Sequence, residues 1–149
     1  MFDPRPLPYT SADATMDPLS LSTGIISLLS VCNTVTQYIS NVKDAPEQRQ
    51  KILNELLLMT GCLTILKANV DNMELLPETF LSLCGEDGVL DQLKECLQTL
   101  WNRLQPGVGF ERFTRRVQWP FRKSEVDDLL RTMERYKTIL VLVLQSDNA

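Results

Sequence analysis

The chain has no histidine among its 149 residues. The Ser-His and Cys-His pairs that activate nucleophiles are therefore unavailable, and zinc sites of the usual Cys/His kinds have little support. The sequence also lacks C-x-x-C spacing, a glycine-rich phosphate loop and an H-E-x-x-H helix. We therefore expect no enzyme activity, no metal and no cofactor. The four cysteines are expected to be reduced core residues of an intracellular protein: Cys32, Cys62, Cys84 and Cys96.

Charge is missing from one long stretch. Pro18 to Val42 runs 25 residues without Asp, Glu, Lys or Arg, although these types make up 23% of the chain. As a helix it would be about 37 Å long, against a bilayer core of ~30 Å. Eleven of its residues are Ser, Thr, Asn or Gln, which is unusual for a permanent transmembrane helix. We expect a helix that can occupy both a folded protein and a membrane. The alternative is an ordinary bundle helix that lacks charge because it is buried from two sides.

The charge that is present is unevenly distributed. A net charge of −4 argues against a general nucleic-acid binder, because duplex affinity depends on many contacts from Lys and Arg to phosphate. Six basic residues and one acid lie between Arg103 and Lys123, whereas Asp71 to Glu95 holds seven acids and one lysine. No basic region precedes the apolar stretch, which argues against a secretory signal peptide and favours the cytoplasm.

Hydrophobic spacing predicts an all-α fold. Residues 1–15 contain three prolines and no apolar period, so we expect a flexible leader there. The fold should occupy residues 16–147, with Asp17 and Pro18 starting the first helix. Further helices are expected from about residue 46, from 89 to 105 and after a capping box at Ser124 and Asp127. A short helix is expected near residues 78–83. The prediction is an antiparallel helical bundle of four long helices plus one short connector helix.

The first helix carries a continuous apolar seam in which the steps alternate between four and three residues. Its opposite face is polar but uncharged. If the helix enters a membrane, the candidate insertion residues are this seam together with Leu29: Leu21, Ile25, Leu28, Leu29, Cys32, Val35, Ile39 and Val42.

Aromatic and basic residues alternate near the last helix. Cations beside amphipathic rings suit an anionic membrane surface, where each Lys or Arg contributes ~1 kcal/mol. The predicted lipid-surface patch comprises Arg112, Arg115, Arg116, Trp119, Arg122 and Lys123. The alternative is that the aromatic rings cap the end of the bundle while the arginines pair with acids between Asp71 and Glu95.

Three short segments resemble the fungal N-terminal domain of STAND proteins, which belongs to the HeLo-like group and typically precedes a NACHT or ankyrin-repeat region. They are the opening from Met16 to Ile26, the Val42 to Pro46 junction, and Trp119-Pro120-Phe121 with Glu125-Val126. The resemblance covers Met16 to about Asp147.

The resemblance implies a helical bundle at the effector end of a fungal innate-immunity receptor. Related HeLo-type domains are thought to trigger cell death when oligomerised, by exposing an N-terminal helix that attacks the plasma membrane. That helix corresponds here to Leu19 through Val42. The expected partners are anionic membrane lipids, like domains through self-association, and fused NACHT or ankyrin regions. The second hypothesis is a soluble adaptor that binds a like domain or a signalling protein.

Overall fold

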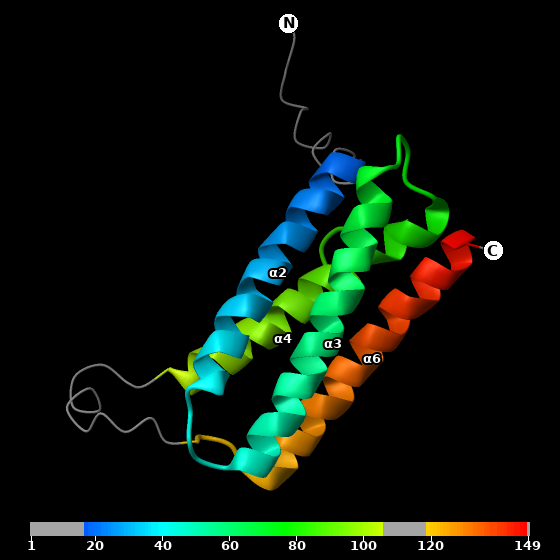
Figure 1. The fold of residues 1–149 in the computed structure, drawn as a ribbon. Coiled ribbons are helices and arrows are strands. Elements are labelled where there is room, and N and C mark those ends of the chain that lie inside the picture. The colour runs from blue at the N-terminus through cyan, green and yellow to red at the C-terminus, as the bar shows by residue number, and fades with distance from the viewer. Residues whose placement is uncertain (1–16, 106–118, 149) are drawn as a thin grey trace, which may run out of the picture.

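The structure is a computed structural model that describes residues 17–105 and 119–148. Every regular element in these two ranges is a helix (Figure 1). The elements are α2 (Pro18–Ser40), α3 (Pro46–Asp71), the 3-10 helix η1 (Glu78–Leu83), α4 (Val89–Leu104) and α6 (Lys123–Asn148). The all-α class is therefore confirmed. The leader expected at residues 1–15 lies outside the described residues.

Helix α2 begins where the sequence predicts. The Asp17 carboxylate accepts a hydrogen bond from the backbone N–H of Ser20 at 2.8 Å, and Pro18 is the first helical residue. Helix α3 also begins at a proline, but no side chain caps it. The residue before it, Ala45, has a φ of 49°, in the left-handed region that residues with a Cβ rarely adopt.

The start of α6 differs from the prediction. The helix begins at Lys123, so Ser124 lies inside it, and the reciprocal acid is Glu125 in place of Asp127. A Glu125 carboxylate oxygen accepts a hydrogen bond from the backbone N–H of Arg122 at 2.8 Å, which satisfies a donor at the helix start. The capping box was therefore placed about two residues too late.

Each long helix packs against two others, in the cyclic order α2, α3, α6, α4 (Figure 1). Two neighbouring pairs are antiparallel. Ser22 near the start of α2 bonds Asp71 at the end of α3, and Arg103 near the end of α4 pairs with Glu125 at the start of α6.

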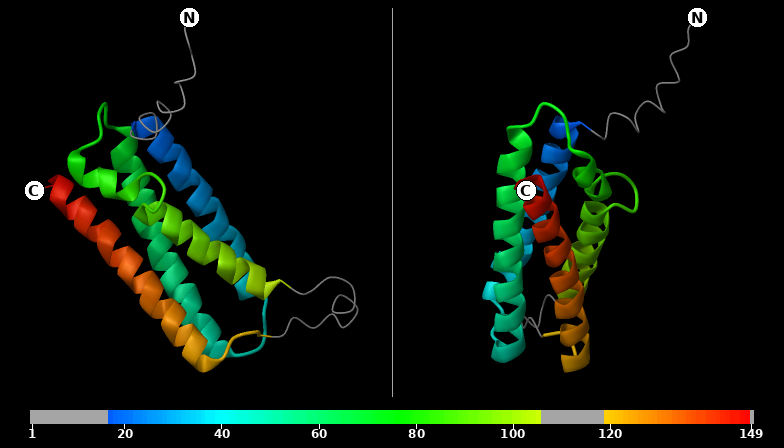
Figure 2. Two further views of the ribbon diagram at one scale, coloured as in Figure 1. Left: turned by 180° about the vertical axis from the view of Figure 1, so that it is seen from behind. Right: turned by 90° about the vertical axis from the view of Figure 1, so that its right-hand side faces the viewer.

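The other two neighbouring pairs run in the same direction. Tyr38 and Trp101 meet near the ends of α2 and α4, with ring centroids 5.3 Å apart. Residues 48 and 55 of α3 contact residues 119 and 137, which follow in the same order along the chain. The expectation of antiparallel packing therefore holds for two pairs only. The connector 72–88, which carries η1, crosses the end of the domain, so that α4 lies beside α2 and α6 (Figure 2).

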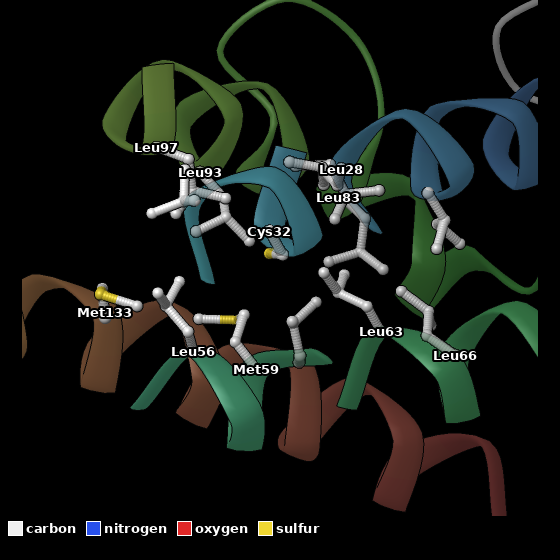
Figure 3. Close-up of a cluster of buried hydrophobic side chains, with 14 of the residues drawn as sticks. Leu28, Cys32, Leu56, Met59, Leu63, Leu66, Leu83, Leu93, Leu97 and Met133 are labelled. Atoms are coloured by element: carbon white, nitrogen blue, oxygen red, sulfur yellow. The ribbon is translucent and has the colours of Figure 1, made fainter. Parts of the chain in front are cut away.

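The core is built from the predicted seams. Side chains from the four long helices and η1 meet between them, among them Cys32, Met59, Leu83, Leu97 and Met133 (Figure 3). Among the described residues the one buried polar side chain is Ser22, which is 7% exposed. The hydroxyl oxygen of Tyr38 is also buried, without a hydrogen-bond partner among the described residues. The rest of the interior is apolar, as expected for helix faces that remove hydrocarbon from water.

Candidate functional site

The residues predicted to enter a membrane form the inner face of α2, except Val42: the helix ends at Ser40 and not at Val42 as expected, so Val42 lies just beyond it. Leu29 is partly buried at the edge of the seam. The members of the seam itself are at most 4% exposed: Leu21, Ile25, Leu28, Cys32, Val35, Ile39 and Val42. The seam packs on α3 and α4. Contact with lipid would therefore require α2 to separate from these two helices.

The outer face of α2 is exposed and uncharged. It consists mainly of polar side chains, which are exposed to solvent in the described part of the structure: Ser20, Thr23, Ser30, Asn33, Thr34 and Gln37. Two large apolar side chains join them, Leu19 at 75% exposure and Ile26 at 51%. The described residues thus bury α2 on one side, so burial from two sides does not explain its lack of charge. Exposed helix positions ordinarily favour Lys, Glu and Arg.

One polar contact between side chains ties α2 to α3. The Ser22 hydroxyl donates to Asp71 at 2.7 Å, and the Lys67 ammonium donates to the other oxygen of the same carboxylate at 2.6 Å. The hydrogen bonds from Lys67 and from Ser22 lower the pKa of Asp71 below its ordinary value. Elsewhere in the described residues α2 is held mainly by apolar packing on α3 and α4.

Helix α3 is attached by an ion pair. The Lys137 ammonium of α6 lies 2.7 Å from a Glu55 carboxylate oxygen of α3, and these side chains are only 16% and 12% exposed. Lys137 also contacts Glu134 at 2.8 Å. Burial acts against the charge of Lys137, but the hydrogen bonds to Glu134 and Glu55 dominate and raise its pKa.

Within residues 17–105 and 119–148, two helices are long and apolar enough to cross a membrane. They are α2, with a mean hydropathy of 1.4, and α3, with 1.2. Core helices of soluble proteins pass the same test, so this finding is weak evidence for membrane association. The difference between the two lies in their charges, because α3 carries Glu55 within its apolar stretch and α2 carries none.

The predicted lipid-surface patch is only partly within the described residues. Arg112, Arg115 and Arg116 lie outside them. Trp119 is partly buried, donates through its indole N–H to the Gln48 side-chain oxygen at 2.7 Å, and packs edge-on against Phe121. Arg122 and Lys123 are exposed. The structure therefore brings two cations to the surface beside an aromatic pair that belongs to the end of the core.

The sequence analysis did not foresee the role of Arg103. Its guanidinium stacks over the Phe121 ring at 4.7 Å, pairs with Glu125 at 2.9 Å and donates to the Pro120 carbonyl at 2.7 Å. The hydrogen bond from Arg103 and that from the Arg122 backbone lower the pKa of Glu125. For Phe121 and Trp119 this geometry supports the alternative of a capped bundle end, although the acid involved lies on α6 and not between Asp71 and Glu95.

The cysteine environments fit a structural role. Burial raises the pKa of the Cys32 thiol to about 11, and burial also raises the pKa of Cys62, Cys84 and Cys96. Reactive cysteines need a lowered pKa, because the thiolate is the nucleophile. Within the two described ranges no cluster of Cys, Asp and Glu could hold a metal ion.

Comparison with family profiles, with curated proteins and with solved structures finds no match to this chain.

Proposed function

We propose that this domain is a membrane-targeting, cell-death-inducing effector of the HeLo-like kind, at the N-terminal end of a fungal NLR-like (STAND) immune receptor. It acts without enzyme chemistry, by oligomerisation and insertion of α2. Its resting form is a four-helix bundle made of the antiparallel pairs α2–α3 and α4–α6. The observation that carries the proposal is the exposed outer face of α2, which has polar side chains but no charge.

Apolar packing keeps a single copy closed in water. The seven seam residues, six in α2 and Val42 just after it, would each lose about 1.5 to 3 kcal/mol on exposure, or roughly 10 to 20 kcal/mol together. The ten Leu, Ile and Val residues between Pro18 and Val42 favour bilayer insertion by only about 3 to 6 kcal/mol. Insertion therefore needs a setting in which the seam is buried again.

Several copies at a membrane supply that setting. Lipid covers the apolar seam, while the Ser, Thr, Asn and Gln side chains of neighbouring α2 helices face one another or water. The absence of charge allows α2 to cross, and its polar face requires other copies. Oligomerisation is therefore part of the mechanism.

Charge also selects α2 over α3 as the inserting helix. Moving α3 into lipid would separate Glu55 from Lys137, and a charge at the bilayer centre costs about 2.5 to 3.5 kcal/mol on the translocon scale. Helix α2 has no such group. The Glu55–Lys137 pair thus supports a mechanism in which α3 and α6 stay together while α2 leaves.

The proposed location is the cytoplasm, with recruitment to the plasma membrane on activation. Exposed Arg122 and Lys123 would attract anionic lipid headgroups, and Arg112, Arg115 and Arg116 would add to this attraction from outside the described residues. Fused NACHT or ankyrin regions would supply the activating signal.

Dye leakage from vesicles that contain phosphatidylserine tests the proposal. The variant Ser30→Asp/Asn33→Asp places two charges on the exposed face near the middle of α2, where neither side chain is needed for core packing. Its insertion should cost about 5 kcal/mol more, so we expect leakage to fall at least tenfold.

The matched control is Thr99→Asp/Asn102→Asp, which has the same spacing on the exposed face of α4. It should leak like the unmodified protein, and circular dichroism should show both variants folded. Equal leakage from both variants would exclude insertion of α2 and would favour the soluble adaptor.

A further inference from the structure

A groove lies between the first half of α2 and the segment that joins η1 to α4. Four of the residues that line it are buried leucines: Leu21 and Leu28 of α2, Leu83 of η1 and Leu90 of α4. Two exposed charged residues, Asp91 and Lys94, also line it. The groove has a volume of about 210 Å³, and a cavity of ~150 Å³ is large enough to hold benzene. It can therefore accept one aromatic side chain.

Gly24 keeps the groove open on the α2 side. It lines the groove, and a Cβ built on it meets no described atom within 4 Å. Glycine is unfavourable in the interior of a helix, because it loses more conformational freedom on folding than other residues do. No contact between the described residues requires glycine at this position. A larger side chain would project into the groove, so glycine here preserves space for an occupant.

The segment 1–16 is joined to the helix that carries the groove. Asp17 directly precedes α2, and the α2 residues of the groove, Ser20 to Leu28, lie about 5 to 17 Å beyond it along the helix axis. Tyr9 is eight residues before Asp17, and eight residues span up to about 26 Å when extended. The segment can therefore reach the whole groove. A short connection gives it an effective concentration in the millimolar range, about a thousandfold above that of a second copy at micromolar concentration.

Tyr9 also matches the groove chemically. Its ring is apolar, and its hydroxyl can donate to a carboxylate such as Asp91 or accept from an ammonium such as Lys94. The segment around it contains three prolines: Pro4, Pro6 and Pro8. Proline restricts the free chain, so less conformational entropy is lost when the chain is fixed on a surface. Phe2 is the other aromatic residue of the segment, but it has no polar group and lies farther from the groove along the chain.

From these observations we infer that the segment 1–16 docks back into the groove between α2 and the start of α4, with the Tyr9 ring as its anchor. The docked segment contacts α2 on one side and η1 and α4 on the other. It therefore adds a contact that must break before α2 separates from the bundle. This consequence for insertion rests on the proposed function, whereas the docking itself does not.

Intramolecular disulfide formation in lipid-free solution, with the full chain, tests the docking. Thr10→Cys places a thiol next to the anchor, and Cys84 already lines the groove. Two further thiols, Cys62 and Cys96, are changed to Ser. Cys32 is retained because it is fully buried. Mild oxidation then joins position 10 to Cys84 at a rate that depends on how often the two thiols meet.

The comparison protein carries Asn72→Cys together with Cys84→Ser. Residue 72 is exposed and is not among the residues that line the groove. It follows Asp71, whose hydrogen bond to Ser22 places it beside the start of α2, so the segment 1–16 can also reach it. We expect the disulfide to Cys84 to form at least tenfold faster. Intrinsic reactivity cannot produce this preference, because burial raises the pKa of the Cys84 thiol and so reduces its thiolate fraction.

A matched pair of glycine variants tests the groove itself. Gly24→Leu fills the groove and should lower the Cys84 rate to that measured for position 72. The control is Gly61→Leu in α3, a helical glycine that lies outside the groove and whose added Cβ also meets no described atom within 4 Å. It should leave the rate unchanged. Tyr9→Ala should lower the rate as Gly24→Leu does, without any change in the folded helices.

Equal rates at positions 84 and 72 would overturn the inference, and so would a Cys84 rate that survives Tyr9→Ala. A disulfide that joins two chains instead of one would also overturn it, since a second copy would then occupy the groove. These outcomes are separate from the proposed function. Leakage that responds to Ser30→Asp/Asn33→Asp would keep insertion even if the two disulfide rates were equal, and only the docking would be removed.

Discussion

The ion pair between α3 and α6 leads to a quantitative prediction. Lys137→Met should destabilise the domain by about 2 to 3 kcal/mol, because Glu55 would remain largely buried without a cationic partner. This value lies below the ~3 to 5 kcal/mol expected for a fully buried pair, since both side chains retain some exposure. Glu55→Gln should cost only about 1 kcal/mol, because Lys137 still contacts Glu134. Urea denaturation followed by circular dichroism measures both free energies of unfolding.

The double variant Glu55→Leu/Lys137→Met is the control. Apolar side chains of similar volume should replace the pair with a change of less than about 1 kcal/mol, since removing both charges removes the desolvation penalty together with the attraction. The reasoning fails if Lys137→Met alone changes the free energy of unfolding by less than about 0.5 kcal/mol, as an exposed pair would. That result would remove the support that the Glu55–Lys137 pair gives to the proposed mechanism, in which α3 stays on α6 while α2 separates.

Two further predictions concern pH and glycine. Arg103 and the backbone of Arg122 hold the pKa of the Glu125 carboxyl below its ordinary value. The Glu125 carboxylate therefore binds a proton more readily in the unfolded chain than in the folded one. The resulting stabilisation is present above about pH 5 and is lost as the pH falls through the folded pKa. Glu125→Gln should therefore flatten the acid limb of thermal stability between pH 5 and pH 3; an unchanged limb would assign it to other carboxylates. Gly61→Ala should raise the free energy of unfolding by about 0.5 to 1 kcal/mol in urea titrations, because a methyl group there meets open space. Gly88→Ala should lower it by more than about 1 kcal/mol, because its Cβ would overlap the Cys84 carbonyl. The same sign for both glycine variants would contradict this account.

Local features of the fold could be predicted from the sequence. The Asp17 cap involves residues three apart, and the buried seams follow from spacings of three and four, so both depend on neighbours along the chain. The run from Ile139 to Leu144 could have been a strand by composition, and its phase with the rest of α6 correctly indicated helix.

Contacts between distant residues could not be predicted in the same way. The partner of Glu55 lies 82 residues away, and its identity depends on α3 and α6 running in the same direction. That direction follows from where the connector 72–88 places α4, which no periodicity encodes. The sequence did contain one signal, because Glu55 is a charge inside an otherwise apolar stretch and such a residue usually has a partner.

The placement of α4 beside α2 has a consequence for synthesis on the ribosome. Sixty-four residues separate the end of α2 at Ser40 from the end of α4 at Leu104. At translation rates of 5 to 20 residues per second, roughly 3 to 13 s pass before the last of α4 is made. During that interval α3 is the one of the two helices packed on α2 in the folded domain that is already complete for part of the time. The apolar seam of α2 can therefore be covered on its α3 side only. Until α4 is complete, the side of the α2 seam that packs on α4 in the folded domain stays uncovered.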